Sequence, residues 1–482
     1  MFDQSFSLST FEIIFNLELR KGKFDFNTMP QDYKDVVANI RLTRSAMAIQ
    51  RRKKLSTWTS DEKKDYDNNR GLLKYYQKQK EEIVQQVLGR LAMQVNSMAF
   101  RFGITSYMYG TKECFAINKA DRAQVFAMKA LQRNVVKAFK VEMQNRHTVM
   151  QNLKLQMNTN LPIYIIRTDV CSFFESIKHD RLFVLIDRNS VLSVKSKEMV
   201  KNIIREYDRV KNVTLVPKGQ GVPRGIGISS PLSEIYMADI DKEIKSRKEV
   251  IFYSRYVDDI LIILAYLPHQ MSLDKYYQEL VSKFKNEYGL TLQSVGTDKC
   301  ELHDLYNDIL GEPRNQTLSY LGYKLYVSEL DGRKRKVLFG LSDDRKKRFK
   351  DRVNRAFERF GHVVKVDTKQ AKRDLRDAIN LITGNIRLMK AKSGVKVGFY
   401  YNNDLLDKDE DFQELEDYLK SKILPIPANL FAKAGDRTAF ESRIRFWINS
   451  ISLRNRWNER LTFDINYERL REIEQWLRNE KR

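Results

Sequence analysis

The amino-acid sequence predicts an α+β fold with a large α-helical C-terminal part. Residues 161–330 alternate short apolar, β-branched runs with helical segments, which is the pattern of strands mixed with helices. Before and after this region, apolar residues recur at helical spacing, as in 71–103 and 342–361. We therefore expect three parts: a largely helical region over 1–160, an α+β region over 161–330 and a basic helical domain over 331–482.

The composition indicates a folded, strongly basic chain. Of its 482 residues, 42% are hydrophobic and 11% aromatic, which excludes a disordered protein. The formal net charge is +24, from 86 Lys and Arg against 62 Asp and Glu. Because this excess is spread along the chain, we expect a polyanionic partner, and nucleic acid rather than an acidic membrane. On charge alone, a basic protein without such a partner stays open.

The helix expected over 342–361 lies next to a dense run of positive charge. Between residues 331 and 355 there are eleven Lys or Arg against four Asp. Ser342 is suited to cap this helix, and Phe349, Val353, Phe357 and Phe360 follow on one face. The opposite face is either simply solvated or lines a groove for nucleic acid.

The three cysteines, Cys114, Cys171 and Cys300, stand far apart in the sequence. They form neither a disulfide framework nor a zinc motif, which fits a reducing cytosol. The N-terminus lacks the pattern of a signal peptide, and the apolar run at 260–267 is too short to span a bilayer. We expect a cytoplasmic protein without membrane contact.

Two adjacent aspartates, Asp258 and Asp259, stand between apolar runs in the segment 251–266. The segment reads as a strand, a tight turn and a second strand, and an ordinary surface turn is one explanation. Another apolar run ends at Asp169, which would place a third carboxylate at the end of a neighbouring strand. Such a cluster suits Mg²⁺, and two ions about 3.5–4 Å apart can support a phosphoryl transfer.

Five segments of the chain resemble, in order and spacing, motifs A to E of reverse transcriptases. They are TDVCSFFESI (168–177), QGVPRGIGISSPLSEIYM (220–237), RYVDD (255–259), GLTLQSVGTDKCEL (289–302) and TLSYLGYKL (317–325). This resemblance implies a right-hand polymerase with fingers and palm of reverse transcriptase type. The fingers would belong to the N-terminal region, the palm to 161–330 with finger elements inserted, and a thumb-like helical domain to 331–482.

The resemblance also implies roles for individual residues in RNA-directed DNA synthesis. Asp169, Asp258 and Asp259 would ligate two Mg²⁺ ions, with Mn²⁺ as a substitute, and the carbonyl of Val170 would add a ligand. Lys299 matches the lysine of motif D, which would protonate or neutralise the departing pyrophosphate. For Lys299, an ordinary surface lysine is the alternative.

Substrate selection is implied for Phe174, which falls on the position of the sugar gate. An aromatic ring there leaves no room for a ribose 2′-hydroxyl, so we expect dNTPs rather than ribonucleotides; packing of Phe174 in the core is the alternative. Gly225 in motif B would let the backbone approach the nucleotide. Arg224 stands where the family usually has Gln, and Glu234 where it often has Asn.

Further contacts are implied in the fingers and at the primer end. Lys112, Lys119 and Arg122 are candidates to bind the triphosphate. The primer-grip hairpin would consist of Tyr320, Leu321, Gly322 and Tyr323. Packing within a hairpin is the alternative for these aromatic residues.

The departures at Arg224 and Glu234 resemble bacterial defence-associated, abortive-infection reverse transcriptases, as does the segment 382–406. The resemblance implies an RNA template, which can be a dedicated noncoding RNA, and a DNA product built on a 3′-hydroxyl or a protein hydroxyl. It implies a role in antiphage defence, and leaves a homo-oligomer or a partner protein open. The alternatives are a retron or group II intron-like reverse transcriptase and a non-catalytic RNA-binding palm scaffold.

Overall fold

The protein consists of two compact units, each built from two separate stretches of the chain. The computed structural model describes residues 2–21, 24, 26–142, 144–158, 161–305, 316–330, 334–388, 396–431 and 433–478. Unit 1 comprises Met1–Glu142 and Phe174–Tyr236, and unit 2 comprises Met143–Phe173 and Met237–Arg482. The chain passes from one unit to the other after Glu142, within the short helix α6 (Phe173–Ser176) and within α9 (Ser229–Lys245).

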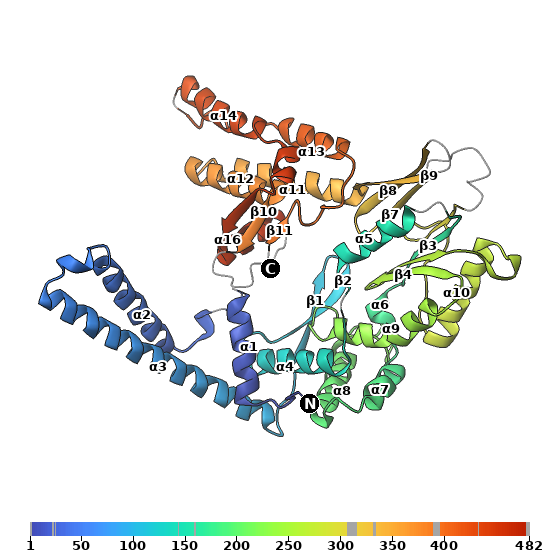
Figure 1. Ribbon diagram of the computed structural model, residues 1–482, viewed down its shortest axis with the longest axis horizontal. Coiled ribbons are helices and arrows are strands. Elements are labelled where there is room, and N and C mark those ends of the chain that lie inside the picture. Colours follow the sequence, from blue (N-terminus) through green and yellow to red (C-terminus); the bar gives the residue numbers. More distant parts are fainter. Residues whose placement is uncertain are drawn as a thin grey trace. The chain divides into compact units, whose positions relative to one another are not determined.

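Unit 1 is mainly helical and has one β-hairpin (Figure 1). Its further elements are α1 (Leu8–Arg20), η1 (Phe26–Thr28), α2 (Gln31–Gln50), η2 (Leu55–Thr57), α3 (Ser60–Asn96), β1 (Ile104–Tyr109), β2 (Lys112–Ile117), α4 (Arg122–Ala138), α7 (His179–Arg188) and α8 (Val194–Val210). Helices α2 and α3 pack side by side as a long pair. Helix α3 begins with a capping box, in which Thr59 and Glu62 satisfy each other's backbone N–H groups.

Unit 2 contains an antiparallel sheet with the strand order β4–β5–β3–β6. Its strands are β3 (Tyr164–Asp169), β4 (Val250–Tyr256), β5 (Asp259–Leu264) and β6 (Glu301–Asp304), and the nearby helices are α5 (Arg146–Met157), η3 (Pro268–Gln270) and α10 (Leu273–Tyr288).

Strand β5 is buried from Ile260 to Leu264, and this explains its uninterrupted apolar run. Alternate residues of β3 point to opposite faces of the sheet. Ile165 belongs to the same core cluster as Met150 of α5, whereas the Thr168 hydroxyl is hydrogen-bonded to that of Tyr277 in α10 at 2.7 Å. Helix α5 therefore covers one face of the sheet and α10 covers the other.

The rest of unit 2 holds two further small sheets and a helical C-terminal region. One sheet has the order β7–β8–β9 and the other β11–β10–β12. The elements are β7 (Gln316–Tyr320), β8 (Tyr323–Leu330), β9 (Lys334–Leu341), α11 (Asp343–Val363), α12 (Thr368–Thr383), β10 (Asn385–Leu388), β11 (Lys396–Gly398), α13 (Glu410–Lys420), α14 (Ala434–Asn449), α15 (Leu453–Asn458), β12 (Thr462–Ile465) and α16 (Tyr467–Leu477).

Helix α11 has the apolar face that the sequence predicts. Phe349, Val353, Phe357 and Phe360 are all buried in the core of unit 2. Ser342 occupies the N-cap position as predicted, but its side chain makes no capping hydrogen bond. The face is therefore set by apolar packing rather than by the cap.

The predicted α+β fold class with a helical C-terminal domain is confirmed. The division at 160/161 and 330/331 stays a prediction, because the two units are defined by compactness and not by function. Residues 389–395 of the segment 382–406 lie outside the described residues. Within the described part of the chain, no helix has the length and apolarity needed to cross a bilayer.

Candidate active site

The central sheet of unit 2 brings the three predicted aspartates together. Asp169 is the last residue of β3, Asp259 is the first of β5, and the two lie directly opposite each other in the antiparallel register. Such cross-strand partners have Cα atoms about 4.5–5.5 Å apart. The backbone N–H of Val170 donates to the carbonyl oxygen of Asp258 at 3.0 Å. We call Asp169, Asp258 and Asp259 the carboxylate site.

The tandem aspartates lie on a strained hairpin. Tyr256 pairs with Asp259, so Val257 and Asp258 form a two-residue turn between β4 and β5. Val257 has a φ of +64°, in the left-handed region that a β-branched residue rarely adopts. A backbone conformation of this kind costs about 1–3 kcal/mol and persists only where its surroundings impose it.

Arg255 is the residue that holds this turn. Its Nη1 donates to the carbonyl oxygen of Val257 at 2.8 Å. The same guanidinium is fixed by Asp241 of α9, with Nε to Oδ1 at 2.9 Å and Nη2 to Oδ2 at 2.8 Å. The Tyr253 hydroxyl also donates to Asp241 Oδ1, at 2.6 Å. Because Arg255 is buried, this ion pair ties the tip of the hairpin to the helix.

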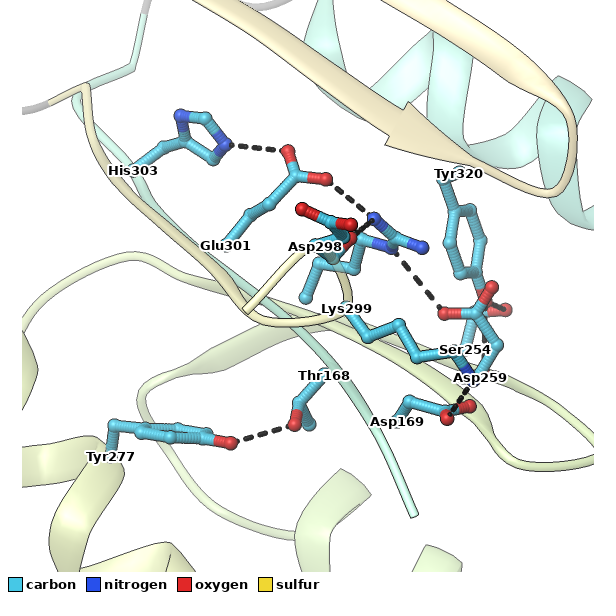
Figure 2. Close-up of polar contacts among 11 residues, drawn as sticks. Thr168, Asp169, Ser254, Asp259, Tyr277, Asp298, Lys299, Glu301, His303 and Tyr320 are labelled. Carbon is cyan, nitrogen blue, oxygen red and sulfur yellow. Dashed lines mark hydrogen bonds and ion pairs between the residues drawn. The ribbon is translucent and has the colours of Figure 1, made fainter. Parts of the chain in front are cut away.

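Two cationic side chains contact the carboxylates (Figure 2). Lys299 Nζ lies 2.5 Å from Asp169 Oδ2, so the predicted lysine of motif D does reach the site. Arg167 Nε lies 3.5 Å from Asp259 Oδ1, while its Nη1 lies 2.5 Å from Glu301 Oε1. Glu301 is in turn 3.3 Å from the ring of His303.

The cations do not fully compensate the negative charge of the site. Burial raises the pKa of Asp259 to about 7, the charge of Arg167 opposes this shift, and the charges of Asp169 and Asp258 add to it. Without a further cation, Asp259 is thus partly protonated near neutral pH. The hydrogen bond to Asp169 raises the pKa of Lys299, which stays protonated.

The donor set of the site fits hard divalent cations. Carboxylate and carbonyl oxygens are the ligands that Mg²⁺ and Mn²⁺ take, and the raised pKa of Asp259 marks an excess of buried negative charge that a cation would relieve. The site is not preformed, however. Among the described residues, no three His, Cys, Asp or Glu side chains are arranged to hold a metal ion, and Lys299 is bound to Asp169.

The predicted primer-grip residues form a tight hairpin next to this site. Leu321 and Gly322 make the turn between β7 and β8, with φ of +45° and +79°, as in a type I′ turn. Tyr320 is buried, and its hydroxyl lies 3.2 Å from that of Ser254 and 3.5 Å from the carbonyl oxygen of Asp259. Tyr323 is buried as well. Both aromatic residues therefore pack inside the protein, and only Tyr320 reaches the carboxylate site.

Other predicted residues lie in unit 1. Arg224 forms a two-pronged ion pair with Glu175, with Nε to Oε1 at 3.0 Å and Nη2 to Oε2 at 3.1 Å. Its guanidinium carbon also lies 4.9 Å from the centroid of the Phe174 ring. Gly225 has a φ of +101°, and a Cβ there would come within 2.7 Å of the Phe115 carbonyl oxygen. Phe174, Arg224 and Gly225 thus form one local cluster.

The predicted triphosphate-binding residues come from neighbouring elements of unit 1. Lys112 begins β2, Lys119 lies between β2 and α4, and Arg122 is the first residue of α4. Both lysines are exposed. Arg122 is partly buried, with its Nη1 at 3.7 Å from Met29 Sδ. Their role in binding a triphosphate stays a prediction.

The sequence analysis missed three residues that support the carboxylate site, namely Arg167, Arg255 and Glu301. Arg167 stands two positions before Asp169 on the same strand, so the period of two places both on one face, and this signal was available. For Arg255 and Glu301 no comparable signal exists. Their partners depend on strand register and on the packing of α9.

An antiparallel sheet with acids at the joined ends of β3 and β5 is the arrangement of a right-hand polymerase palm. A family model described as "Reverse transcriptase (RNA-dependent DNA polymerase)" matches residues 117–325, which include these strands and the flanking glycine loop. The chain thus carries a reverse transcriptase domain. The match indicates an RNA-directed DNA polymerase, which is a nucleotidyltransferase.

Similar solved structures are telomerases. Apo telomerase from Candida tropicalis, truncated from its C-terminal domain, is 16% identical, with 48% of this chain and 55% of that chain covered and a TM-score of 0.32. Telomerase from Candida albicans with a fragment of telomeric RNA is 11% identical, with 78% and 69% covered and a TM-score of 0.33. The chain spans about half the length of the apo telomerases from Candida tropicalis, with 55% of the truncated and 46% of the other chain covered. The sequence identities and TM-scores of these pairs are low. No curated protein matches the chain.

Proposed function

We propose that this chain is an RNA-directed DNA polymerase that extends a hydroxyl group with deoxynucleotides at the carboxylate site. The observation that carries the proposal is the direct pairing of Asp169 with Asp259 in a domain of reverse transcriptase type. The hydroxyl attacks the α-phosphate of a dNTP and pyrophosphate leaves. The attacking hydroxyl belongs to a primer 3′ end or to a protein side chain.

Asp169, Asp258, Asp259 and the carbonyl of Val170 would hold two divalent cations, Mg²⁺ or Mn²⁺. Such ions activate the attacking hydroxyl and stabilise the charge on the leaving oxygen. The chain's own part is to keep the oxygen ligands in place. Arg167 orients Asp259, and Arg255 fixes the turn that carries Asp258.

Lys299 is suited to neutralise the pyrophosphate. Its side chain is 56% exposed, so it can move away from Asp169 when a cation takes its place there. A raised pKa makes it a weak proton donor but a permanent positive charge. We therefore assign it charge neutralisation rather than proton donation.

Phe174 would select deoxyribose, and Arg224 would hold its ring. The ion pair between Arg224 and Glu175 fixes the guanidinium that lies against the ring. Gly225 would give the nucleotide close access to the backbone. Replacement of Phe174 by Ala should increase incorporation of ribonucleotides relative to dNTPs, and an unchanged ratio would remove Phe174 from this role.

The remaining contacts follow the resemblance to reverse transcriptases. Lys112, Lys119 and Arg122 would bind the triphosphate, and the hairpin at Leu321–Gly322 would support the primer end. The template is RNA, such as a dedicated noncoding RNA, held mainly through its phosphates and hence released by salt. By the same resemblance, we propose a cytoplasmic enzyme of bacterial antiphage defence rather than one of a retron or group II intron-like element.

A second candidate function is a non-catalytic RNA-binding scaffold. It is favoured by the ion pair of Lys299 with Asp169 and by the absence, among the residues that the structure describes, of a preformed group of three metal-binding side chains. In such a scaffold the lysine would replace the cations permanently. The two candidates differ in their response to Mg²⁺.

The test is incorporation of labelled dNTPs with Mg²⁺, with and without copurified RNA, by the wild type and by Asp258→Ala/Asp259→Ala. The polymerase proposal requires activity in the wild type and none in the double variant. Glu279→Ala, which removes an exposed acid of α10, is the matched control and should remain active. Activity in the double variant would indicate a contaminant, and no activity in any protein would favour the scaffold.

A readout besides activity is the stabilisation of the protein by Mg²⁺. A cation that binds the folded state raises the midpoint of thermal unfolding. This shift should appear in the wild type and in Glu279→Ala, and disappear in the double variant. If Mg²⁺ shifts all three proteins equally, the carboxylate site does not hold it.

A further inference from the structure

A second region of unit 2 is rich in positive charge and is built from other elements than those that carry the three aspartates. A cavity of about 370 Å³ is lined by α11, the end of α12, the middle of α13 and the turn after β11. Its polar lining consists of Arg345, Arg348, Arg352, Asn402 and Asn403. We call this cavity the arginine pocket. Among the described residues that line it there is no Asp or Glu.

The three arginines share one face of α11 because they stand three and four residues apart. Phe349, from the same helix, and Phe399 lie on the apolar side of the cavity, and both are buried. The pocket thus combines an apolar floor with a cationic rim. Small ligands with one charged end are bound in cavities of this kind.

Arg345 is held by neutral partners. Its Nη1 donates to the carbonyl oxygen of Asn402 at 2.7 Å and also to the side chain of Asn403. Its guanidinium carbon lies 5.3 Å from the ring centroid of Tyr323. Burial lowers the pKa of Arg345 to about 9, and the charge of Arg146 adds to this. Since a guanidinium stays protonated in proteins, the shift records a positive charge that the fold does not compensate.

Arg352 also lacks a compensating hydrogen bond within the described part of the chain, and the one that Arg348 makes is to a neutral group. Burial lowers the pKa of Arg352, and its buried Nε has no hydrogen-bond partner among the described residues. Arg348 Nε donates to the carbonyl oxygen of Asp344 at 3.2 Å, again a neutral group. The nearby Glu474 opposes the lowered pKa of Arg352 only in part, because its carboxylate lies 2.9 Å from Arg478.

Two lysines of α11 form ion pairs, whereas the arginines that line the pocket form none with the described residues. Lys346 lies 2.5 Å from Asp411, and Lys350 lies 2.7 Å from Glu414, both acids of α13. These acids of α13 therefore neutralise Lys346 and Lys350 and form no ion pair with the arginines of the pocket.

A neighbouring cavity of this unit contains an arginine whose positive charge is compensated by acids. That cavity has a volume of about 530 Å³ and is lined in part by Arg469. The Nη2 of Arg469 lies 2.7 Å from Asp374 and 2.8 Å from Asp377. Arg469 therefore has a structural explanation, and the arginines of α11 need another.

We propose that the arginine pocket binds a phosphate group, carried either by a free nucleotide or by the backbone of a nucleic-acid strand. Guanidinium groups present planar pairs of N–H donors that match two phosphate oxygens, and they carry the charge that a phosphate lacks. The amides of Asn402 and Asn403 can complete the shell of hydrogen bonds. The proposal concerns binding alone and does not depend on polymerase activity.

The test measures binding of two fluorescein-labelled probes, AMP and a short single-stranded DNA, by anisotropy. The full-length protein is used with EDTA, so that divalent cations do not recruit phosphates to the aspartates. The variants are Arg348→Gln and Arg352→Gln. The matched control is Lys347→Gln, which removes one charge from an exposed position of the same helix.

We expect each arginine variant to weaken the relevant probe about tenfold, the effect of losing one charged hydrogen-bond pair, while Lys347→Gln binds like the wild type. Weakened AMP binding assigns the pocket to a free nucleotide, and a loss confined to DNA assigns it to a strand. Equal weakening by Lys347→Gln, or unchanged binding of both probes in both arginine variants, would overturn the proposal. Arg348 is exposed, so its variant tests the pocket even if Arg352→Gln does not fold.

Discussion

The carboxylate site and the arginine pocket belong to the same unit and carry opposite unbalanced charges. At the carboxylate site, Asp169 and Asp259 each have a cationic partner, and the pKa of Asp259 is still raised to about 7. In the arginine pocket, Arg345 and Arg352 have lowered pKa values and no acid lines the described cavity. One region lacks positive charge and the other lacks negative charge.

This difference distinguishes two kinds of charged residue: those whose ion pairs stabilise the fold, and those whose charge no ion pair compensates. Arg167 and Arg255 are buried beside acids, so removing either leaves an unpaired carboxylate. Arg352 is partly buried and makes no ion pair among the described residues, and the nearby Glu474 is paired with Arg478, so removing Arg352 breaks no ion pair. Groups kept at a cost to stability are typical of binding sites.

The largest effect should come from Asp169→Asn, which keeps the shape of the side chain and removes its charge. If Asp169 holds a catalytic cation, we expect dNTP incorporation to fall by about a thousandfold or more, because metal ligation supplies several kcal/mol. The rate of incorporation with Mg²⁺ measures this, with Glu279→Gln as control. A variant that retains most of its activity would break the proposed role of the carboxylate site.

Arg167→Met should cause the next largest effect, on stability. It leaves Glu301 and Asp259 buried without their cation, which costs about 3–5 kcal/mol of unfolding free energy. Urea denaturation of the metal-free protein measures the loss. A loss no greater than that of an exposed control such as Lys347→Met would show that the ion pair is not structural.

Asp259→Asn should stabilise the metal-free protein at high pH. The folded pKa of about 7 exceeds the usual value of 3.8, so the folded state binds the proton of Asp259 more tightly. The contribution of this group to wild-type stability is therefore fully present below the lower value and is lost as pH rises through about 7. We compare the unfolding free energy of the variant with that of the wild type at each pH. This difference should shift in favour of the variant by on the order of 2 kcal/mol between pH 5 and pH 8.

Urea denaturation in EDTA at the two pH values tests this expectation. The same pH dependence in both proteins would mean that Asp259 is not the group concerned. Added Mg²⁺ should reduce the difference, because a bound cation compensates the charge.

Arg352→Met should give the smallest effect, and with the opposite sign to Arg167→Met. Removing a partly buried charge that makes no ion pair among the described residues should stabilise the protein by about 1 kcal/mol. The midpoint of thermal unfolding, with Lys347→Met as control, measures it. A strong destabilisation would remove the contrast between the two regions, since Arg352 would then be a structural residue like Arg167.

The sequence was enough to predict the α+β class and the aspartates, because their signals are local. An apolar run that ends at Asp169 predicts one strand, and an apolar run that follows Asp259 predicts another. The partners of those acids could not be predicted. Whether Arg167 meets Glu301 depends on the pairing of β3 with β6, which joins residues more than a hundred positions apart.

The arginine pocket could not be predicted for a related reason. The sequence shows a run of positive charge on α11 but does not say which of its residues are buried. Lys347 is exposed, whereas Arg345 and Arg352 are partly buried in a cavity, and a groove for nucleic acid on this face stays a prediction. Burial of these side chains is set by the turn at Phe399–Asn403, which packs against the helix from elsewhere in the chain.

The left-handed backbone of Val257 has a consequence for how the protein matures. A chain segment on its own avoids this conformation, so the tip of the hairpin can form only after Arg255 and the N–H of Val170 capture its carbonyl groups. Nascent or partly unfolded chains would then lack the spatial grouping of acids and could not sequester metal ions prematurely. The proposed cation affinity would thus depend on the folded hairpin.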